Sequence, residues 1–216
     1  RSLLALTVRK AYVGPLMAMS DSNNRTYYDD FSSWYERERG AGYNALIDEI
    51  EVDAVKEFAV GKRVLEAGCG TGLVLSRLSR VAREAHGFDL SAGMAEKAKQ
   101  RGLSVALGSV TQIPFRDDTF DFVCSFKVLA HVPDITGALA ELARVTRPGG
   151  TLSLEFYNPW SLRFLAKRIA GPGRISEDRT EADVYTRWDA PTTIQKLLPP
   201  SLRLVGYRGV RVVTPA

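Results

Sequence analysis

Cysteine and histidine are scarce in this chain, and long apolar runs are missing. Only two cysteines, Cys69 and Cys124, and 2 histidines occur among the 216 residues. Without a CxxC or Cys/His spacing, these cysteines exclude a disulfide scaffold and argue against a zinc site, so we expect no metal. No apolar stretch approaches the roughly 18 residues that a transmembrane helix needs. We therefore expect a cytoplasmic protein without a membrane span.

The rest of the composition is that of an ordinary globular domain. The chain is 45% hydrophobic and 25% charged, and its 29 Lys and Arg against 25 Asp and Glu give a net charge of +4. These proportions exclude a disordered or collagen-like chain. We expect residues 1–20, which contain the candidate start residues Met17 and Met19, to be an added or flexible N-terminal segment. Residues 21–216 are expected to form one domain.

Strand and helix patterns alternate along most of this domain. The expected strands are short apolar runs, at residues 63–67, 84–89, 104–107, 120–126 and 151–156, with one or two closing strands in 202–213. The expected helices show apolar residues at three- and four-residue spacing, at 27–38, 43–58, 73–78, 91–100, 135–146 and 192–198. Strands separated by helices of this length predict an α/β domain with a parallel sheet covered on both faces.

A glycine-rich loop follows the first predicted strand. The segment Val64-Leu65-Glu66-Ala67-Gly68-Cys69-Gly70-Thr71-Gly72 joins a buried strand to a helix. Closely spaced glycines let the backbone approach a ligand and aim amide groups at it, whereas a plain strand–helix turn needs one glycine. The dinucleotide-binding pattern is G-x-G-x-x-G. The G-x-G-x-G spacing found here therefore disfavours a nicotinamide enzyme.

An acidic residue, Asp89, ends the second predicted strand within Gly87-Phe88-Asp89-Leu90-Ser91. An acid at this point of an α/β sheet can accept hydrogen bonds from both hydroxyl groups of a ribose. The alternative is an acid that only stabilises the N-terminus of the following helix. The position after the second strand favours the ribose role.

Two further motifs follow the third and fourth predicted strands. They are Gly108-Ser109-Val110-Thr111-Gln112-Ile113-Pro114-Phe115 and Cys124-Ser125-Phe126-Lys127-Val128-Leu129-Ala130-His131-Val132-Pro133-Asp134. The second motif leaves the sheet at its carboxyl edge, where open α/β sheets bind ligands. His131 could remove a proton from an acceptor hydroxyl or amine, and the alternative is a packing histidine at the start of a helix. His86 lies within a predicted strand and is expected to be structural.

These motifs, in this order and spacing, resemble class I S-adenosylmethionine (SAM)-dependent methyltransferases, in particular the small-molecule branch that includes enzymes of ubiquinone and menaquinone biosynthesis. The resemblance covers residues 27–213. It implies a Rossmann-like, mostly parallel seven-stranded sheet with helices on both faces. It also implies that Gly68, Cys69 and Gly70 line the methionine part of SAM, with Glu66 near its amino group.

The resemblance assigns the adenine side of the site as well. Leu90 and Met94 would offer apolar surface to the adenine. The family usually has an acid after the glycine of the third motif, where it binds the adenine amino group. This chain has Ser109 there, which is a weaker acceptor, so adenine recognition would depend more on the Val110 backbone.

The fourth motif and two aromatic segments would complete the site. By resemblance, Ser125 and Phe126 pass under the cofactor while Leu129 and His131 face the acceptor. Residues 21–60 would form a helical cap in which Tyr28, from a Y-D-x-x-x-x-x-Y pattern, covers the cofactor, and residues 157–190 would form a lid insertion after the fifth strand. The alternative for these aromatics is ordinary core packing.

The sequence thus predicts transfer of a methyl group from SAM to an oxygen or nitrogen atom of a small molecule, with S-adenosylhomocysteine as product. Because the sulfonium is already an activated leaving group, positioning of the acceptor in line would supply most of the rate. An RNA methyltransferase is one alternative, but the basic residues 163, 167, 168 and 174 are diluted by nearby acids, so nucleic acid is not the expected partner. A SAM-binding protein without catalysis is the other.

Overall fold

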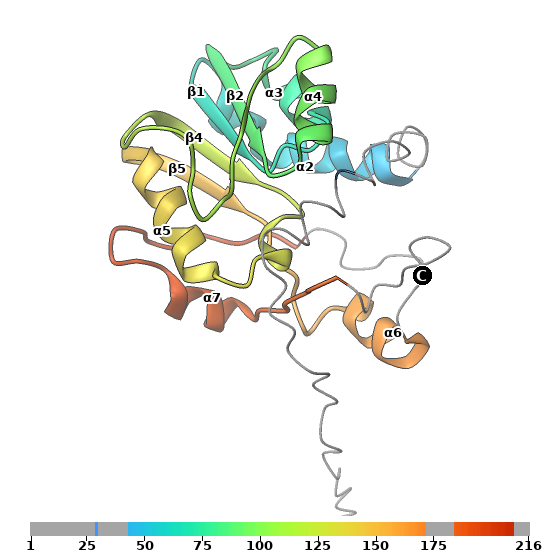
Figure 1. The fold of residues 1–216 in the computed structure, drawn as a ribbon. Helices are drawn as coiled ribbons and strands as arrows, with labels where there is room; N and C mark the ends of the chain where they lie inside the picture. Colours follow the sequence, from blue (N-terminus) through green and yellow to red (C-terminus); the bar gives the residue numbers. More distant parts are fainter. Residues whose placement is uncertain (1–28, 30–42, 172–183, 210–216) are drawn as a thin grey trace, which may run out of the picture.

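The computed structural model describes residue 29, residues 43–171 and residues 184–209 (Figure 1). The predicted N-terminal segment, residues 1–20, lies outside the described residues. So does the predicted helix at 27–38 apart from Asp29, and so do residues 172–183 of the predicted lid.

Five parallel strands form one sheet, in the order β3-β2-β1-β4-β5. The strands are β1 (Arg63–Ala67), β2 (Glu84–Asp89), β3 (Ser104–Leu107), β4 (Phe120–Ser125) and β5 (Thr146–Leu154). The chain adds β2 and β3 on one side of β1, and then β4 and β5 on the other. Such a reversal leaves a crevice at the carboxyl ends of the strands, where open α/β sheets bind ligands.

Helices cover both faces of the sheet (Figure 1). The helices are α2 (Tyr43–Ala59), α3 (Leu73–Leu78), α4 (Ala92–Gln100), α5 (Ile135–Val145), α6 (Leu162–Ala170) and α7 (Pro191–Leu197), with a short 3-10 helix η1 (Leu129–His131) after β4. Among the residues that the structure describes, no helix has the length and apolar character needed to cross a membrane.

Successive side chains of β1 enter two separate cores, because neighbouring residues of a strand point to opposite faces of the sheet. Leu65 packs in one cluster with Leu139 of α5. Val64 packs in the other with Val55 of α2 and Leu78 of α3. The sheet is therefore apolar on both faces, as expected for parallel strands between layers of helices.

The expected seven-stranded sheet is wrong in the described part of the chain. Residues 202–209, where closing strands were expected, form no strand. The side chains of Val205 and Tyr207 are each 83% exposed. Because a strand is stabilised by ladder hydrogen bonds and by a packed face, apolar composition alone does not make this segment part of the sheet.

The last strand also begins earlier than expected, at Thr146 instead of residue 151. Thr146 pairs with Phe120 directly after α5 ends, and Phe122 pairs with Thr151, so the register shifts between these two pairs. The irregularity accommodates the Pro148-Gly149-Gly150 segment, in which Gly149 has a φ of 77°. A bulge can absorb proline and glycine where a regular strand cannot.

Truncation of a core side chain in α5 should destabilise the domain strongly. Leu142 is fully buried, so we expect Leu142→Ala to lower the free energy of unfolding by about 3 kcal/mol through lost burial and the cavity left behind. Urea denaturation followed by circular dichroism measures this change. Leu204→Ala, at a side chain that is 40% exposed, is the control and should change it by less than about 0.5 kcal/mol. Equal effects at the two positions would contradict the core described above.

Candidate active site

The glycine loop connects β1 to α3 with backbone conformations that favour glycine. Gly68 and Gly70 have φ values of 72° and 54°. A Cβ atom on Gly68 would lie 2.3 Å from Cγ2 of Val128, so the loop and the segment after β4 approach each other too closely for a side chain. A Cβ atom on Gly70 would meet nothing within 4 Å. The requirement at Gly70 is therefore its left-handed backbone rather than space.

Asp89 joins this loop to the start of α4. One carboxylate oxygen, Oδ2, accepts a hydrogen bond from Gly70 N at 2.8 Å, and the other, Oδ1, accepts one from Ser91 N at 2.9 Å. Burial raises the pKa of Asp89, and the hydrogen bonds from the backbone oppose this rise. A carboxylate has about four lone-pair sites, so each oxygen keeps capacity for a further donor. Two adjacent hydroxyl groups of a ribose fit that capacity.

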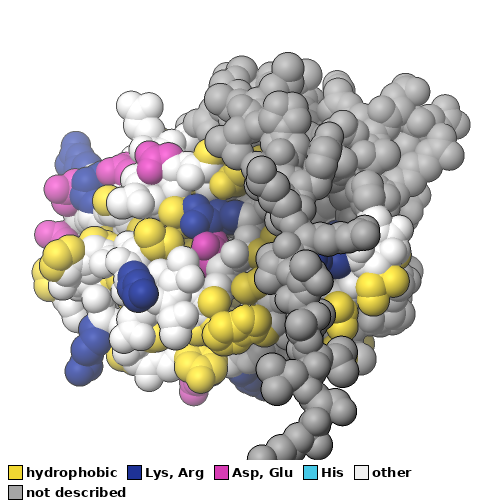
Figure 2. Space-filling view, turned by 90° about the horizontal axis from the view of Figure 1, so that it is seen from below, with side chains coloured by type: hydrophobic (Ala, Val, Ile, Leu, Met, Phe, Trp, Pro, Cys, Tyr) yellow, Lys and Arg dark blue, Asp and Glu magenta, His cyan; other side chains and the backbone are white. Residues whose placement is uncertain are grey.

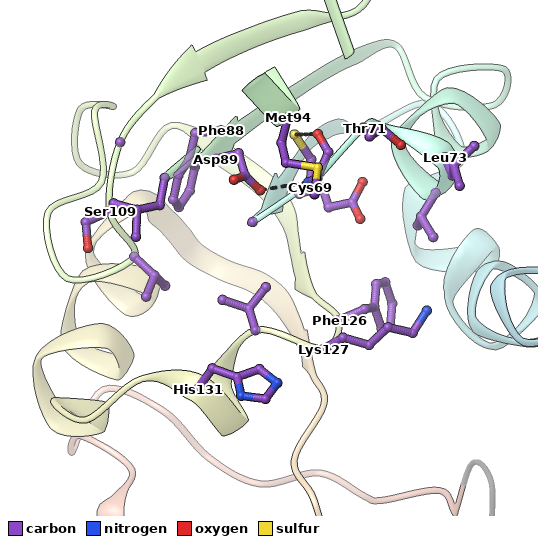
Figure 3. Close-up of a pocket in the computed structure, with 18 of the residues that line it drawn as sticks. Cys69, Thr71, Leu73, Phe88, Asp89, Met94, Ser109, Phe126, Lys127 and His131 are labelled. Atoms are coloured by element: carbon purple, nitrogen blue, oxygen red, sulfur yellow. Dashed lines mark hydrogen bonds between the residues drawn. The ribbon is translucent and has the colours of Figure 1, made fainter. Parts of the chain in front are cut away.

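A pocket opens at the carboxyl ends of β1, β2 and β4 (Figure 3). It contains about 1060 Å³ of empty space, part of it open to solvent. Figure 3 shows Asp89 and Met94 on one side and His131 and Phe126 on the other. The pocket therefore brings together residues from opposite sides of the strand-order reversal, where open α/β sheets bind ligands.

Most residues expected from the sequence line this pocket. The lining includes Glu66, Gly68, Cys69, Gly70, Asp89, Leu90, Met94, Ser109, Val110, Phe126 and His131. Tyr28 lies outside the described residues. The neighbouring Asp29 accepts hydrogen bonds from Ser91 Oγ at 2.5 Å and from Gly93 N at 3.0 Å. Asp29 was not expected to make a contact of its own, but through these two hydrogen bonds it binds the N-terminus of α4.

The structure places Ser125 in the core rather than on the pocket wall. Its side chain is fully buried, and its hydroxyl donates to the carbonyl oxygen of Ala67 at 2.9 Å. The hydroxyl therefore joins β4 to β1 below the pocket. Ser109 does line the pocket, and its Oγ lies 2.8 Å from Oγ1 of Thr111 in the same turn.

An ion cluster that the sequence analysis missed lies at one end of the pocket. Lys127, whose φ is 62°, donates from Nζ to Asp48 Oδ1 at 2.8 Å and to Glu51 Oε2 at 2.7 Å. Both acids are on α2 and only 2% exposed. The backbone N of Lys127 also donates to Glu155 Oε2 at 2.8 Å. The sequence did carry a signal for this cluster. Asp48 and Glu51 are acids three residues apart in α2, next to the buried Ile47.

Glu66 adds a third buried carboxyl group to this end of the pocket. Burial raises the pKa of Glu66 well above its usual value, Lys127 opposes the rise, and Glu51 and Asp48 add to it. Its Oε2 atom is buried and has no hydrogen-bond partner within the described part of the chain. Three carboxyl groups therefore surround one ammonium group. The amino group of a bound amino acid would be a suitable additional cation.

Cys69 lines the pocket but is not suited to nucleophilic chemistry. Burial, followed by the charges of Glu66 and Asp89, raises the pKa of the Cys69 thiol above its usual range. The reactive form of cysteine is the thiolate, which is disfavoured here. Cys69 therefore only lines the pocket, with its side chain and its backbone.

His131 lies across the pocket from Asp89 (Figure 3). Its Nδ1 is 2.8 Å from the carbonyl oxygen of Tyr185. Because a carbonyl oxygen only accepts, Nδ1 carries the proton of the neutral ring, and Nε2 is then the basic nitrogen. The ring meets Tyr157 edge-on, with centroids 5.9 Å apart, and Tyr157 in turn contacts Trp188 at 5.3 Å. Aromatic rings therefore pack behind His131, outside the set of residues that line the pocket.

Removal of the Lys127 charge should cost considerable stability. In Lys127→Met the buried carboxylates of Asp48 and Glu51 lose their cation, so we expect the free energy of unfolding at pH 8 to fall by about 3 kcal/mol. The control is Lys56→Met in α2, the helix that carries the two acids, because Lys56 and Asp53 form an exposed pair with side chains 56% and 67% accessible. That change should cost less than about 0.5 kcal/mol. Chemical denaturation distinguishes the two, and a Lys127 variant as stable as the control would refute the ion cluster.

Comparison with known proteins agrees with this geometry. Residues 65–154 match the family described as methyltransferase domain. The demethylmenaquinone methyltransferase of Mycobacterium marinum is 35% identical over 133 residues, which are 58% of this chain and 58% of that protein. The chain thus spans less than two thirds of the length of this curated relative.

Two solved structures share the fold. A SAM-dependent methyltransferase from Thermotoga maritima is 25% identical, covers 82% of this chain and 79% of its own, and has a TM-score of 0.62. Magnesium protoporphyrin IX methyltransferase from Synechocystis PCC 6803 with bound SAH has a TM-score of 0.66 over 82% of this chain and 87% of its own. At 19% identity the second likeness concerns the fold alone. With its glycine loop, the acid after β2 and the matching family, this chain carries, in residues 65–154, the methyltransferase domain of class I SAM-dependent enzymes.

Proposed function

We propose that this chain transfers a methyl group from SAM to an oxygen or nitrogen atom of a small molecule. The observation that carries the proposal is the pocket itself. Asp89 and the glycine loop form one wall, the carboxyl groups of Glu66 and Asp48 lie at one end, and His131 stands opposite with the ring of Tyr157 packed against it. A cofactor with a ribose, a charged amino acid and a reactive group between them matches these three features.

The residues present fit SAM group by group. Asp89 would accept from the ribose hydroxyls, and the orphaned Oε2 of Glu66 would accept from the amino group. Gly68, Cys69 and Gly70 line the pocket between these two acids and would contact the methionine part. Leu90, Met94 and Val110 would then contact the adenine. When bound, SAM supplies an electrophilic methyl group on a positively charged sulfur.

The protein's own contribution to the reaction is positioning and proton removal. The hydrogen bond from Nδ1 to Tyr185 fixes the orientation of His131 and leaves Nε2 as the nitrogen that can accept a proton. A hydroxyl or amine acceptor held beside Nε2 would lose its proton there as it becomes a nucleophile. Holding that atom in line with the methyl group is expected to supply most of the rate.

The wall next to His131 indicates the class of acceptor. Tyr157 and Trp188 present ring surfaces behind His131, and Phe126 lines the pocket from the β4 side. Aromatic side chains bind planar apolar groups well, since such rings pack in offset or edge-on contacts. We therefore expect an acceptor with an aromatic or quinone-like ring, in keeping with the name of the Mycobacterium marinum relative.

Loss of the Asp89 carboxylate should weaken cofactor binding. Calorimetric titration of S-adenosylhomocysteine is expected to show micromolar affinity for the unmodified chain and an affinity about tenfold or more lower, equal to about 1.4 kcal/mol, for Asp89→Ala. Asp89→Asn, which keeps one acceptor oxygen, should lie between the two. Asp53→Ala, at an exposed acid, should bind as the unmodified chain does, and NADH should not bind. Preference for NADH, or equal binding by the Ala variant, would overturn the cofactor assignment.

Replacement of His131 should slow the reaction without weakening the cofactor. In His131→Asn the side-chain amide can still donate toward Tyr185, but the basic Nε2 is gone. We expect kcat to fall about 100-fold, in the range for a lost general base, and the acidic limb of the pH–rate profile to disappear. S-adenosylhomocysteine affinity should be unchanged. An Asn variant with nearly full activity would show that His131 only packs.

A further inference from the structure

Helix α6 turns its apolar face away from the protein. Leu162, Leu165 and Ile169, which we call the α6 apolar face, follow at three- and four-residue spacing and therefore lie on one side of the helix. Their exposed fractions are 56%, 54% and 79%. Trp160, just before the helix, is 72% exposed. A helix on the surface of a globular protein normally turns such a face to the core, so this one is oriented the opposite way.

The inward side of α6 is held by aromatic contacts. Phe164 meets Trp188 with ring centroids 5.0 Å apart. Ser161 caps the helix by accepting from Phe164 N at 3.2 Å. Trp188 contacts Tyr157, and Tyr157 contacts His131. A continuous row of rings thus joins α6 to the acceptor side of the pocket.

Positive charge lies at the border of the α6 apolar face. Arg168 is exposed, and its guanidinium group lies 5.8 Å from the centre of the Phe164 ring. Lys167 is half-buried and, five residues after Leu162, lies on the other side of the helix. Figure 2 views the molecule from below, the side on which α6 lies in Figure 1, and shows hydrophobic and basic side chains exposed together on this face. Long basic side chains at the edge of an apolar face can extend toward anionic groups while the apolar residues are buried.

We propose that α6 docks on the surface of an anionic lipid bilayer. An aliphatic face, a tryptophan at one end and basic residues on the remaining sides are the features of interfacial helices, and the net charge of +4 adds long-range attraction. An acidic protein partner is disfavoured because the centre of the face is aliphatic rather than basic. The inference goes beyond the proposed methyl transfer, since it assigns a docking surface. It would place the row of rings that joins α6 to His131 next to the lipid.

Vesicle co-sedimentation tests this proposal. The unmodified chain should bind vesicles of phosphatidylcholine mixed with phosphatidylglycerol, and it should bind less as salt is added, because salt screens the attraction. The double variant Leu165→Asp/Ile169→Asp should lose about tenfold or more in partition coefficient. Arg168→Glu should weaken binding to the mixed vesicles more than to pure phosphatidylcholine. Val60→Asp, at a residue that is 59% exposed beyond the end of α2, is the matched control and should bind normally.

A fluorescent label locates the contact. Because both native cysteines are buried, Ile169→Cys can be labelled selectively with an environment-sensitive dye. Its emission should shift to the blue when mixed vesicles are added, whereas a dye on Val60→Cys should not respond. Absence of vesicle binding by the unmodified chain, or full binding by the double Asp variant, would overturn the proposal. The proposal would also be overturned if the dye emission shifted with increasing protein concentration, or on addition of an acidic protein, and not on addition of lipid.

The outcome is separable from that of the methyltransferase proposal. The substituted side chains are exposed and lie outside the pocket lining, so S-adenosylhomocysteine should bind the double Asp variant as tightly as the unmodified chain. A variant that binds this ligand but not vesicles supports the docking surface. A chain that binds vesicles through α6 but no S-adenosylhomocysteine would leave the docking surface intact and reject the cofactor.

Discussion

The carboxylate of Asp89 sets the geometry on which the rest of the pocket depends. Because it accepts from Gly70 on one side and from Ser91 on the other, it fixes the glycine loop after β1 against the start of α4. Asp29 binds the same helix start through Ser91 and Gly93. Unpaired amides at a helix N-terminus stabilise negative charge, which favours acids at this position.

The other end of the pocket handles charge differently. There, Lys127 balances two buried acids of α2, and the buried Oε2 of Glu66 has no hydrogen-bond partner among the described residues. Burying a carboxylate is costly unless it is paired, so this end favours an incoming positive group. The pocket therefore has an end for hydroxyl donors and an end for a cation, joined by glycine backbone. This polarity, more than the fold, is what suits it to a nucleoside that carries an amino acid.

The central part of the fold could be predicted from the sequence. The strands at 63–67, 84–89 and 104–107 and the helix at 73–78 have the expected bounds, because each is a short apolar pattern set off by polar or glycine-containing segments. The predictions that were wrong concern the edge of the sheet at β5. Whether Thr146 or residues 202–209 enter the sheet depends on a partner strand distant in the chain, which local composition does not report.

For the site, the sequence by itself determined which residues meet at the pocket because of their place after a strand: the glycine loop, Asp89 and His131. A strand's carboxyl end always meets the same edge of a parallel sheet, so these residues converge whatever the details. Only the tertiary structure decided that Ser125 binds Ala67, that Lys127 meets acids of α2, and which nitrogen of His131 carries the proton. Each of these depends on the direction of a side chain toward a partner distant in the chain, and residue spacing alone does not encode that direction.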